Sequence, residues 1–303
     1  MYGAVMGLAG LGLTGRAAAP LFPGLVRAPA YLTEPWVLLG TLLLALLIPA
    51  YLVKLLRYPS AVRDDFTRPA TFGFCGALPV GMSLVAGGIA PYAPLAGSVL
   101  WWIACALLAA LQVWAIYRWL CGGIELPQVN AGWLIIFVGG IVVPGPGIGL
   151  GHAEASRFFF SVSAAAAPLI MALLFYRAVV APQLAEALRP SWFVLLVPPS
   201  LIYANGAALF GDTPALEGLY FSALVLALGL FAYSWKFWKW PFAPSWWAFT
   251  FPLDALAYAA ARYAQQHPEP LWRGVAAASL LLAASFVVLV LVRTVRSAAS
   301  PRA

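Results

Sequence analysis

Few side chains in this sequence of 303 residues have the types and spacings that catalysis or metal binding requires. The sequence contains 2 histidines and 10 acidic residues. His152 and Glu154 could hold a metal ion, but two ligands without further histidine or cysteine make a weak site. Ser83 stands in GMSLV, which lacks the final glycine of a nucleophile elbow. The segment GPGIGLG around Gly147 lacks the spacing of a nucleotide-binding loop. We therefore expect no enzyme, no catalytic residue, no metal and no cofactor.

Asp254 is the acidic residue that we place inside an apolar helix. A carboxyl group in such a place is costly to ionise, and it faces a cavity or a partner by default. The structural alternative is a hydrogen-bonded carboxyl that joins two helices. Both interpretations of Asp254 stay open from the sequence.

The composition shows what must surround these residues. Hydrophobic residues make up 63% of the chain, charged residues make up 9%, and the mean hydropathy is +0.91. A soluble domain is about 25% charged, so this composition excludes a soluble fold and predicts a lipid bilayer as the surroundings. The net charge of +7 is typical of orientation charge in a membrane protein, and we expect no nucleic-acid partner.

Apolar runs broken by glycine, proline and charge predict ten transmembrane helices. Their approximate ranges are 1–15, 35–56, 71–89, 96–119, 131–150, 157–180, 191–210, 216–236, 245–264 and 271–293. The ten helices pair into five hairpins of similar length, which is a common device in transport proteins. We expect an all-α integral membrane protein with one transmembrane domain over residues 1–303.

Lysine and arginine are unequally divided between the two sides of this arrangement. One side collects 12 of the 17 basic residues: Lys54, Arg57, Arg63, Arg68, Arg118, Arg177, Arg189, Lys236, Lys239, Arg293, Arg296 and Arg302. The other side collects Arg16, Arg27, Arg157, Arg262 and Arg273. Because basic residues favour the cytoplasm, we expect both termini to be cytoplasmic.

Prolines concentrate in the third, fifth, seventh and ninth predicted helices. Pro79, Pro144, Pro198 and Pro252 lie in these helices, and the first helix carries glycines in place of proline. Proline frees a backbone carbonyl, which a membrane protein tolerates where the helix is buried in protein or lines a wet cavity. The odd helices are therefore predicted to form an inner ring around a pathway. The alternative is that proline is simply frequent in membrane helices.

Collinear segments over nearly the whole chain carry a family resemblance. They are YGAVMGLAGLGLTGR, KLLRYPSAVRDDFTRPATFGFCGALPVGMSL, GGIVVPGPGIGLGHAEASRFFFS, LRPSWFVLLVPPS and SWWAFTFPLDALAYA. The chain resembles the tellurite-resistance/dicarboxylate transporter family, which includes plant slow anion channels and bacterial TehA-like proteins. The resemblance implies a quasi-fivefold bundle with inner odd helices around a central pore, and a homotrimer with one pore in each subunit.

The resemblance also assigns roles to particular residues. A pore-plugging phenylalanine of the channel branch corresponds to Phe251 in WWAFTFP; without the resemblance, Phe251 would be ordinary core packing. Gly140 stands in GGIVVP where many relatives have asparagine, and Asp254 stands where small or apolar residues are common. Both differences bear on selectivity and leave the predicted fold unchanged.

Two functions remain from these expectations. One is a channel in the cell membrane that passes small inorganic or organic anions through a pore gated by Phe251. The other is a carrier for dicarboxylate, sulfite or tellurite-related oxyanions, in which Asp254 could couple transport to protons. In either case an unpaired Asp254 beside an anion path is expected to be a largely neutral acid, because desolvation and a nearby anion both disfavour the charged form.

Overall fold

A computed structural model describes residues 2–23 and 29–299, which form helices and turns with no strand among them. The α-helices are α1 Tyr2–Ala18, α2 Pro29–Arg57, α3 Pro59–Thr67, α4 Pro69–Phe72, α5 Ala77–Ile89, α6 Pro94–Leu120, α7 Gly132–Val142, α8 Pro144–Gly149, α9 Ala153–Val180, α10 Val197–Phe210, α11 Pro214–Tyr233, α12 Thr250–Gln266 and α13 Pro270–Ala299. The 3-10 helices are η1 Ala19–Leu21, η2 Gly73–Gly76, η3 Leu126–Gln128, η4 Glu186–Leu196, η5 Phe237–Lys239 and η6 Pro244–Ala248. The predicted all-α class is confirmed.

Nine helical stretches in the described residues are long and apolar enough to cross a bilayer. They are Tyr2–Leu21, Tyr31–Arg57, Pro69–Ile89, Pro94–Leu120, Gly132–Gly149, Ala153–Val180, Glu186–Phe210, Pro214–Tyr233 and Pro270–Ala299. At the predicted helix 245–264 the structure has η6 followed by the 17 residues of α12. The protein is a multi-pass membrane protein, while the count of ten spans stays a prediction.

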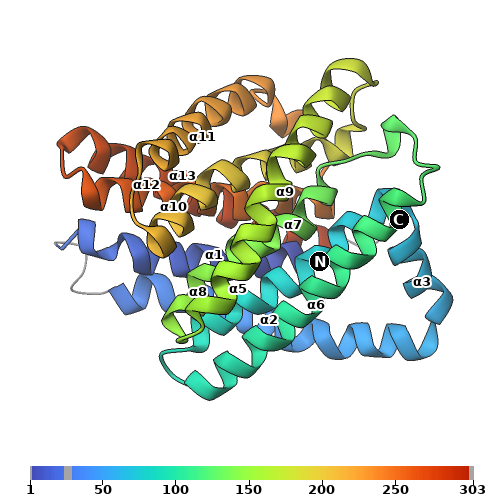
Figure 1. Ribbon diagram of the computed structural model, residues 1–303, viewed down its shortest axis with the longest axis horizontal. Coiled ribbons are helices and arrows are strands. Elements are labelled where there is room, and N and C mark those ends of the chain that lie inside the picture. Colours follow the sequence, from blue (N-terminus) through green and yellow to red (C-terminus); the bar gives the residue numbers. More distant parts are fainter. Residues whose placement is uncertain (1, 24–28, 300–303) are drawn as a thin grey trace.

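The odd and even predicted helices differ sharply in burial. The most apolar stretches of α1, α4–α5, α7–α8 and η4–α10 are 61% to 83% buried inside the protein. Those of α2, α6, α9, α11 and α13 are only 17% to 39% buried. Figure 1 shows α1 and α5 running through the middle of the molecule, with α11 along its upper edge and α2 and α6 along its lower edge. The even helices therefore present apolar side chains outward, as a lipid-facing layer requires.

Four of the inner helices change conformation just before, or at, a proline. The 3-10 segments η2, η4 and η6 pass into α5, α10 and α12, in whose first turns Pro79, Pro198 and Pro252 lie. In the fifth predicted helix, α7 ends at Val142 and α8 begins at Pro144. Proline removes a backbone donor and crowds the preceding turn, which accounts for a break at this point in each helix. The inner helix α1 has no proline and is continuous.

Several outer helices begin at a proline, where the missing N–H would have no partner in any case. Pro94, Pro214 and Pro270 are the first residues of α6, α11 and α13. At the start of α11 the hydroxyl of Thr213 also accepts a hydrogen bond from the N–H of Leu216, at 3.3 Å.

The short helix α3, between the second and third predicted spans, was not expected from the sequence.

Candidate functional site

Two cavities lie among the buried inner helices, and Phe251 stands between them. The larger, of about 640 Å³, is the Asp254 cavity, and its wall includes Thr14, Asn205 and Asp254. The smaller, of about 300 Å³, is the Trp247 cavity. Each cavity is lined by residues of all five inner segments of the chain. Of the residues that the structure describes, Phe251 alone lines both cavities, and it is only 5% exposed.

Phe251 is held at this position by the close approach of α1 to α12. A Cβ added at Gly7 would overlap the hydroxyl of Thr250, and one added at Gly10 would lie 3.0 Å from the Phe251 ring. The lack of a side chain at these two positions lets the backbones of the two helices pack tightly. The glycines of α1 therefore set where the ring of Phe251 lies.

Asp254 lies on the same side of α12, one turn after Phe251, and is 1% exposed. Neither of its carboxyl oxygens has a hydrogen-bond partner among the described residues. A Cβ added at Gly10 would lie 2.8 Å from Oδ2, so the carboxyl packs against bare backbone of α1. The hydroxyl of Thr14 donates to the backbone carbonyl of Asp254 at 3.1 Å and does not reach the carboxyl group. No basic side chain in the described part of the chain forms an ion pair with Asp254.

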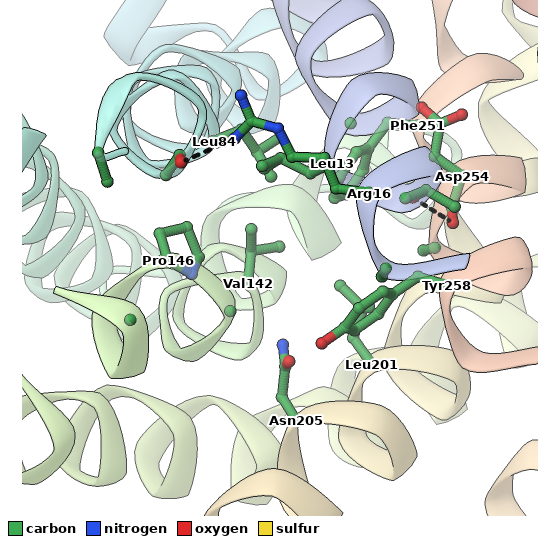
Figure 2. Close-up of a pocket in the computed structure, with 18 of the residues that line it drawn as sticks. Leu13, Arg16, Leu84, Val142, Pro146, Leu201, Asn205, Phe251, Asp254 and Tyr258 are labelled. Atoms are coloured by element: carbon green, nitrogen blue, oxygen red, sulfur yellow. Dashed lines mark hydrogen bonds between the residues drawn. The ribbon is translucent and has the colours of Figure 1, made fainter. Parts of the chain in front are cut away.

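Two further polar residues of the Asp254 cavity were not singled out from the sequence. Asn205 of α10 is 2% exposed and donates its amide Nδ2 to the carbonyl of Ile141 at 2.7 Å. Tyr258 lies one turn after Asp254 on α12. Figure 2 shows the Asn205 amide and the Tyr258 hydroxyl directed into the same space, with the Asp254 carboxyl pointing toward α1. The signal available in the sequence was their polarity within apolar helices and, for Tyr258, its spacing of four from Asp254.

An ion pair closes one edge of the Asp254 cavity. The guanidinium of Arg16 donates to both carboxylate oxygens of Glu34, at 2.9 Å and 2.6 Å, and to the backbone carbonyl of Gly88 at 2.9 Å. Tyr92 also donates to Glu34, at 2.9 Å, and this bond raises the pKa of its exposed hydroxyl. The pair ties the ends of α1 and α5 to the start of α2. The sequence identified Arg16 only as an orientation charge.

The remaining predicted site residues lie at several places along the inner helices. Pro252 lines the Trp247 cavity, and Pro146, two residues after Pro144, lines the Asp254 cavity. Pro79 and Pro198 line lateral pockets, the first beside α2 and α6 and the second beside α9 and α11. A Cβ at Gly140 would lie 2.6 Å from the carbonyl of Phe159, so Gly140 faces α9.

His152, one of the two possible metal ligands in the sequence, has other partners. His152 lies 2.6 Å from the hydroxyl of Ser98 and stacks on the ring of Trp101, with 4.9 Å between ring centroids. No group of three or more potential metal ligands occurs in residues 2–23 and 29–299.

Comparisons of this sequence with known proteins all find similarity to the same group of membrane channels. Three relatives from Arabidopsis thaliana are S-type anion channels. SLAH2 is 27% identical over 242 residues, which is 76% of this chain and 45% of that protein. SLAH3 is 24% identical over 247 residues, 79% of this chain and 38% of that protein. The guard cell channel SLAC1 is 23% identical over 248 residues, 78% of this chain and 43% of that protein.

The chain therefore spans less than half the length of these curated relatives. The sequence model of the SLAC1 family, described as "Voltage-dependent anion channel", matches residues 1–295. Because this match covers nearly the whole of a helical membrane protein, the chain belongs to the SLAC1 family.

Proposed function

We propose that this protein is an anion channel in which Phe251 closes a path through the inner ring. The observation that carries the proposal is the position of Phe251 between two cavities, each of which is bordered by all five inner segments. An aromatic ring is suited to this role because it dewets a narrow constriction and can leave it by a change of rotamer. The family and the plant relatives are described as anion channels, which supports the same function.

The charges along the path favour conduction over tight binding. Arg16 is the basic residue in the described lining of the Asp254 cavity, and it is already paired with Glu34. The described lining of the Trp247 cavity contains no charged residue. A path without a free fixed cation binds anions weakly, and weak binding lets an ion leave as readily as it enters.

Replacing Phe251 by alanine tests the proposed gate. We expect Phe251→Ala to raise chloride flux into proteoliposomes by about tenfold or more, since each 1.4 kcal/mol taken from the barrier gives a factor of ten. Phe74→Ala is the matched control, because Phe74 lines the Trp247 cavity and not the Asp254 cavity. A flux that stays at the parent level in the Phe251 variant would contradict the gate.

A carrier for dicarboxylate, sulfite or tellurite-related oxyanions is the second candidate, and the unpaired carboxyl of Asp254 favours it. A carboxyl that binds and releases a proton inside a transport path could couple an anion to a proton. Uphill accumulation of malate or sulfite driven by a pH gradient would support the carrier and exclude a passive channel. No catalytic activity is proposed.

The remaining expectations extend the proposal to the whole assembly. We propose a quasi-fivefold bundle of ten spans in the cell membrane, with cytoplasmic termini and three subunits that each hold a pore. The breaks at Pro79, Pro144, Pro198 and Pro252, together with Gly140, shape the inner ring in this proposal. Native mass spectrometry in detergent should give a complex of three 32.3-kDa chains, and a monomer alone would contradict the trimer.

A further inference from the structure

The polar groups of Asn205 and Tyr258 have hydrogen-bonding capacity that the protein itself does not use. The hydroxyl of Tyr258 makes no hydrogen bond within the described part of the chain, although the residue lines the Asp254 cavity. The amide nitrogen of Asn205 has two hydrogens, of which the carbonyl of Ile141 receives one. The Oδ1 of Asn205 is buried without a partner. Buried polar groups normally have a partner, so unused groups on a cavity wall indicate a ligand or water.

The two side chains reach the same space from two helices that pack against each other. Asn205 comes from α10 and Tyr258 from α12, and Figure 2 shows their polar ends close together and directed into the cavity. The Oδ1 of Asn205 is 3.8 Å from the position that a Cβ on Gly145 would take, and Gly145 also lines this cavity. Phe251 lines the same cavity, so an anion held by these two side chains rests in the space that Phe251 closes.

A nearby charge favours an anion in this space. Arg262 lies four residues after Tyr258 on α12 and acts on it electrostatically. Its Nε is buried without a hydrogen-bond partner, and none of the ion pairs among the described residues includes Arg262. A partly buried positive charge is screened less than an exposed one, so it contributes a favourable potential to this end of the cavity.

We propose that Tyr258 and Asn205 form an anion subsite in the Asp254 cavity, where a partly dehydrated small anion rests before it passes Phe251. The inference rests on the proposed channel function and adds to it the residues that determine selectivity. The Tyr258 hydroxyl and the free Asn205 N–H donate to the anion and replace part of its hydration shell. The Oδ1 of Asn205 accepts a hydrogen from a water molecule that the anion retains.

Selectivity between anions of different hydration tests the subsite. Chloride loses a strongly held hydration shell when it enters a narrow path, whereas thiocyanate is weakly hydrated and needs less replacement. We expect Tyr258→Phe, made in the Phe251→Ala background so that the gate does not limit the rate, to lower the ratio of chloride to thiocyanate permeability. The expected decrease is about two- to tenfold, the factor that corresponds to one hydrogen bond. Reversal potentials in planar bilayers give the ratio directly.

Tyr203→Phe in the same background is the matched control. The hydroxyl of Tyr203 donates to Gln266 at 3.2 Å, and Tyr203 lines neither central cavity. An unchanged ratio in Tyr258→Phe, or the same decrease in the Tyr203 control, would overturn the subsite while leaving the channel intact. If the Phe251→Ala background itself shows no anion current, the proposed function fails, and the subsite fails with it.

Discussion

Asp254 is the residue whose surroundings most strongly constrain transport. Its carboxyl is fully enclosed, has no partner among the described residues and shares the wall of a cavity with Phe251. An isolated ionised carboxylate in such a place is strongly disfavoured, whereas a protonated one is tolerated. The sequence left open a hydrogen-bonded carboxyl that joins two helices, and the structure shows no such bond within its described residues.

The protonation of Asp254 gives a prediction with a definite sign. At neutral pH the carboxyl is expected to be neutral and to let anions pass. Raising the pH should ionise it, place a negative charge beside the path and reduce anion flux. Asp254→Asn keeps the shape without the ionisable proton, so its flux should stay high across the same pH range. Flux measured in proteoliposomes from pH 6 to pH 9 checks this, and parallel profiles for parent and variant would contradict it.

Gly10 gives a second prediction at the residue scale. A methyl group there would lie 2.8 Å from Asp254 Oδ2 and 3.0 Å from the Phe251 ring. Gly10→Ala is therefore expected to lower the free energy of unfolding by about 1–3 kcal/mol through overpacking. Gly229→Ala is the control, because a Cβ at that position on α11 would meet no atom within 4 Å beyond the adjacent backbone of its own helix. Thermal unfolding in detergent should show a lower midpoint for the first variant only.

At the scale of elements, an ion pair connects the ends of two inner helices with the start of an outer helix. The Arg16–Glu34 pair connects α1 with α2, and the bond from Arg16 to the carbonyl of Gly88 adds α5. Both side chains are about a quarter exposed, at 23% and 27%. Solvent therefore screens the pair, and we expect its contribution to the stability of the fold to be modest. Its geometry, with two parallel donors on one carboxylate, is the strong form of such a pair.

Exchanging the charges of Arg16 and Glu34 separates the contribution of their ion pair to stability from the effects of the surrounding residues. Arg16→Glu and Glu34→Arg are each expected to lower the thermal unfolding midpoint, because each places two like charges together at the cavity edge. The double variant should recover part of the loss, with a coupling energy of about 1 kcal/mol in a double-mutant cycle. Full additivity of the two single effects would show that the pair does not join these helices.

At the scale of the whole molecule, the orientation of the chain can be tested with its own cysteines. Cys121 is exposed, just after the end of α6, whereas Cys105 is buried within α6. The distribution of basic residues predicts that Cys121 faces the cytoplasm. A membrane-impermeant maleimide should therefore label Cys121 in inside-out vesicles and not in intact cells. Glu269→Cys in a Cys121→Ser background should give the opposite result, and the same labelling of both would exclude the predicted orientation.

Much of the architecture could be predicted from the sequence alone. The apolar runs located nine stretches that are long enough to span a bilayer, and proline marked the breaks in the inner helices. These features are local, because helix length depends on continuous apolar sequence and proline disrupts the turn in which it stands. The ninth predicted helix shows where this local prediction fails. Its α-helical part has only 17 residues, because its first turns are a 3-10 helix.

The composition of the site was decided by the tertiary structure. Asn205, Tyr258 and the Arg16–Glu34 pair come from separate helices, and no spacing along the chain brings them together. The direction of each side chain also depends on the turn geometry before it. A 3-10 segment has 3.0 residues per turn where an α-helix has 3.6, so each break rotates the faces that follow. The rotation applies to Pro198, which follows η4 and lines a pocket beside outer helices, and to Phe251, which follows η6 and lies between the two cavities.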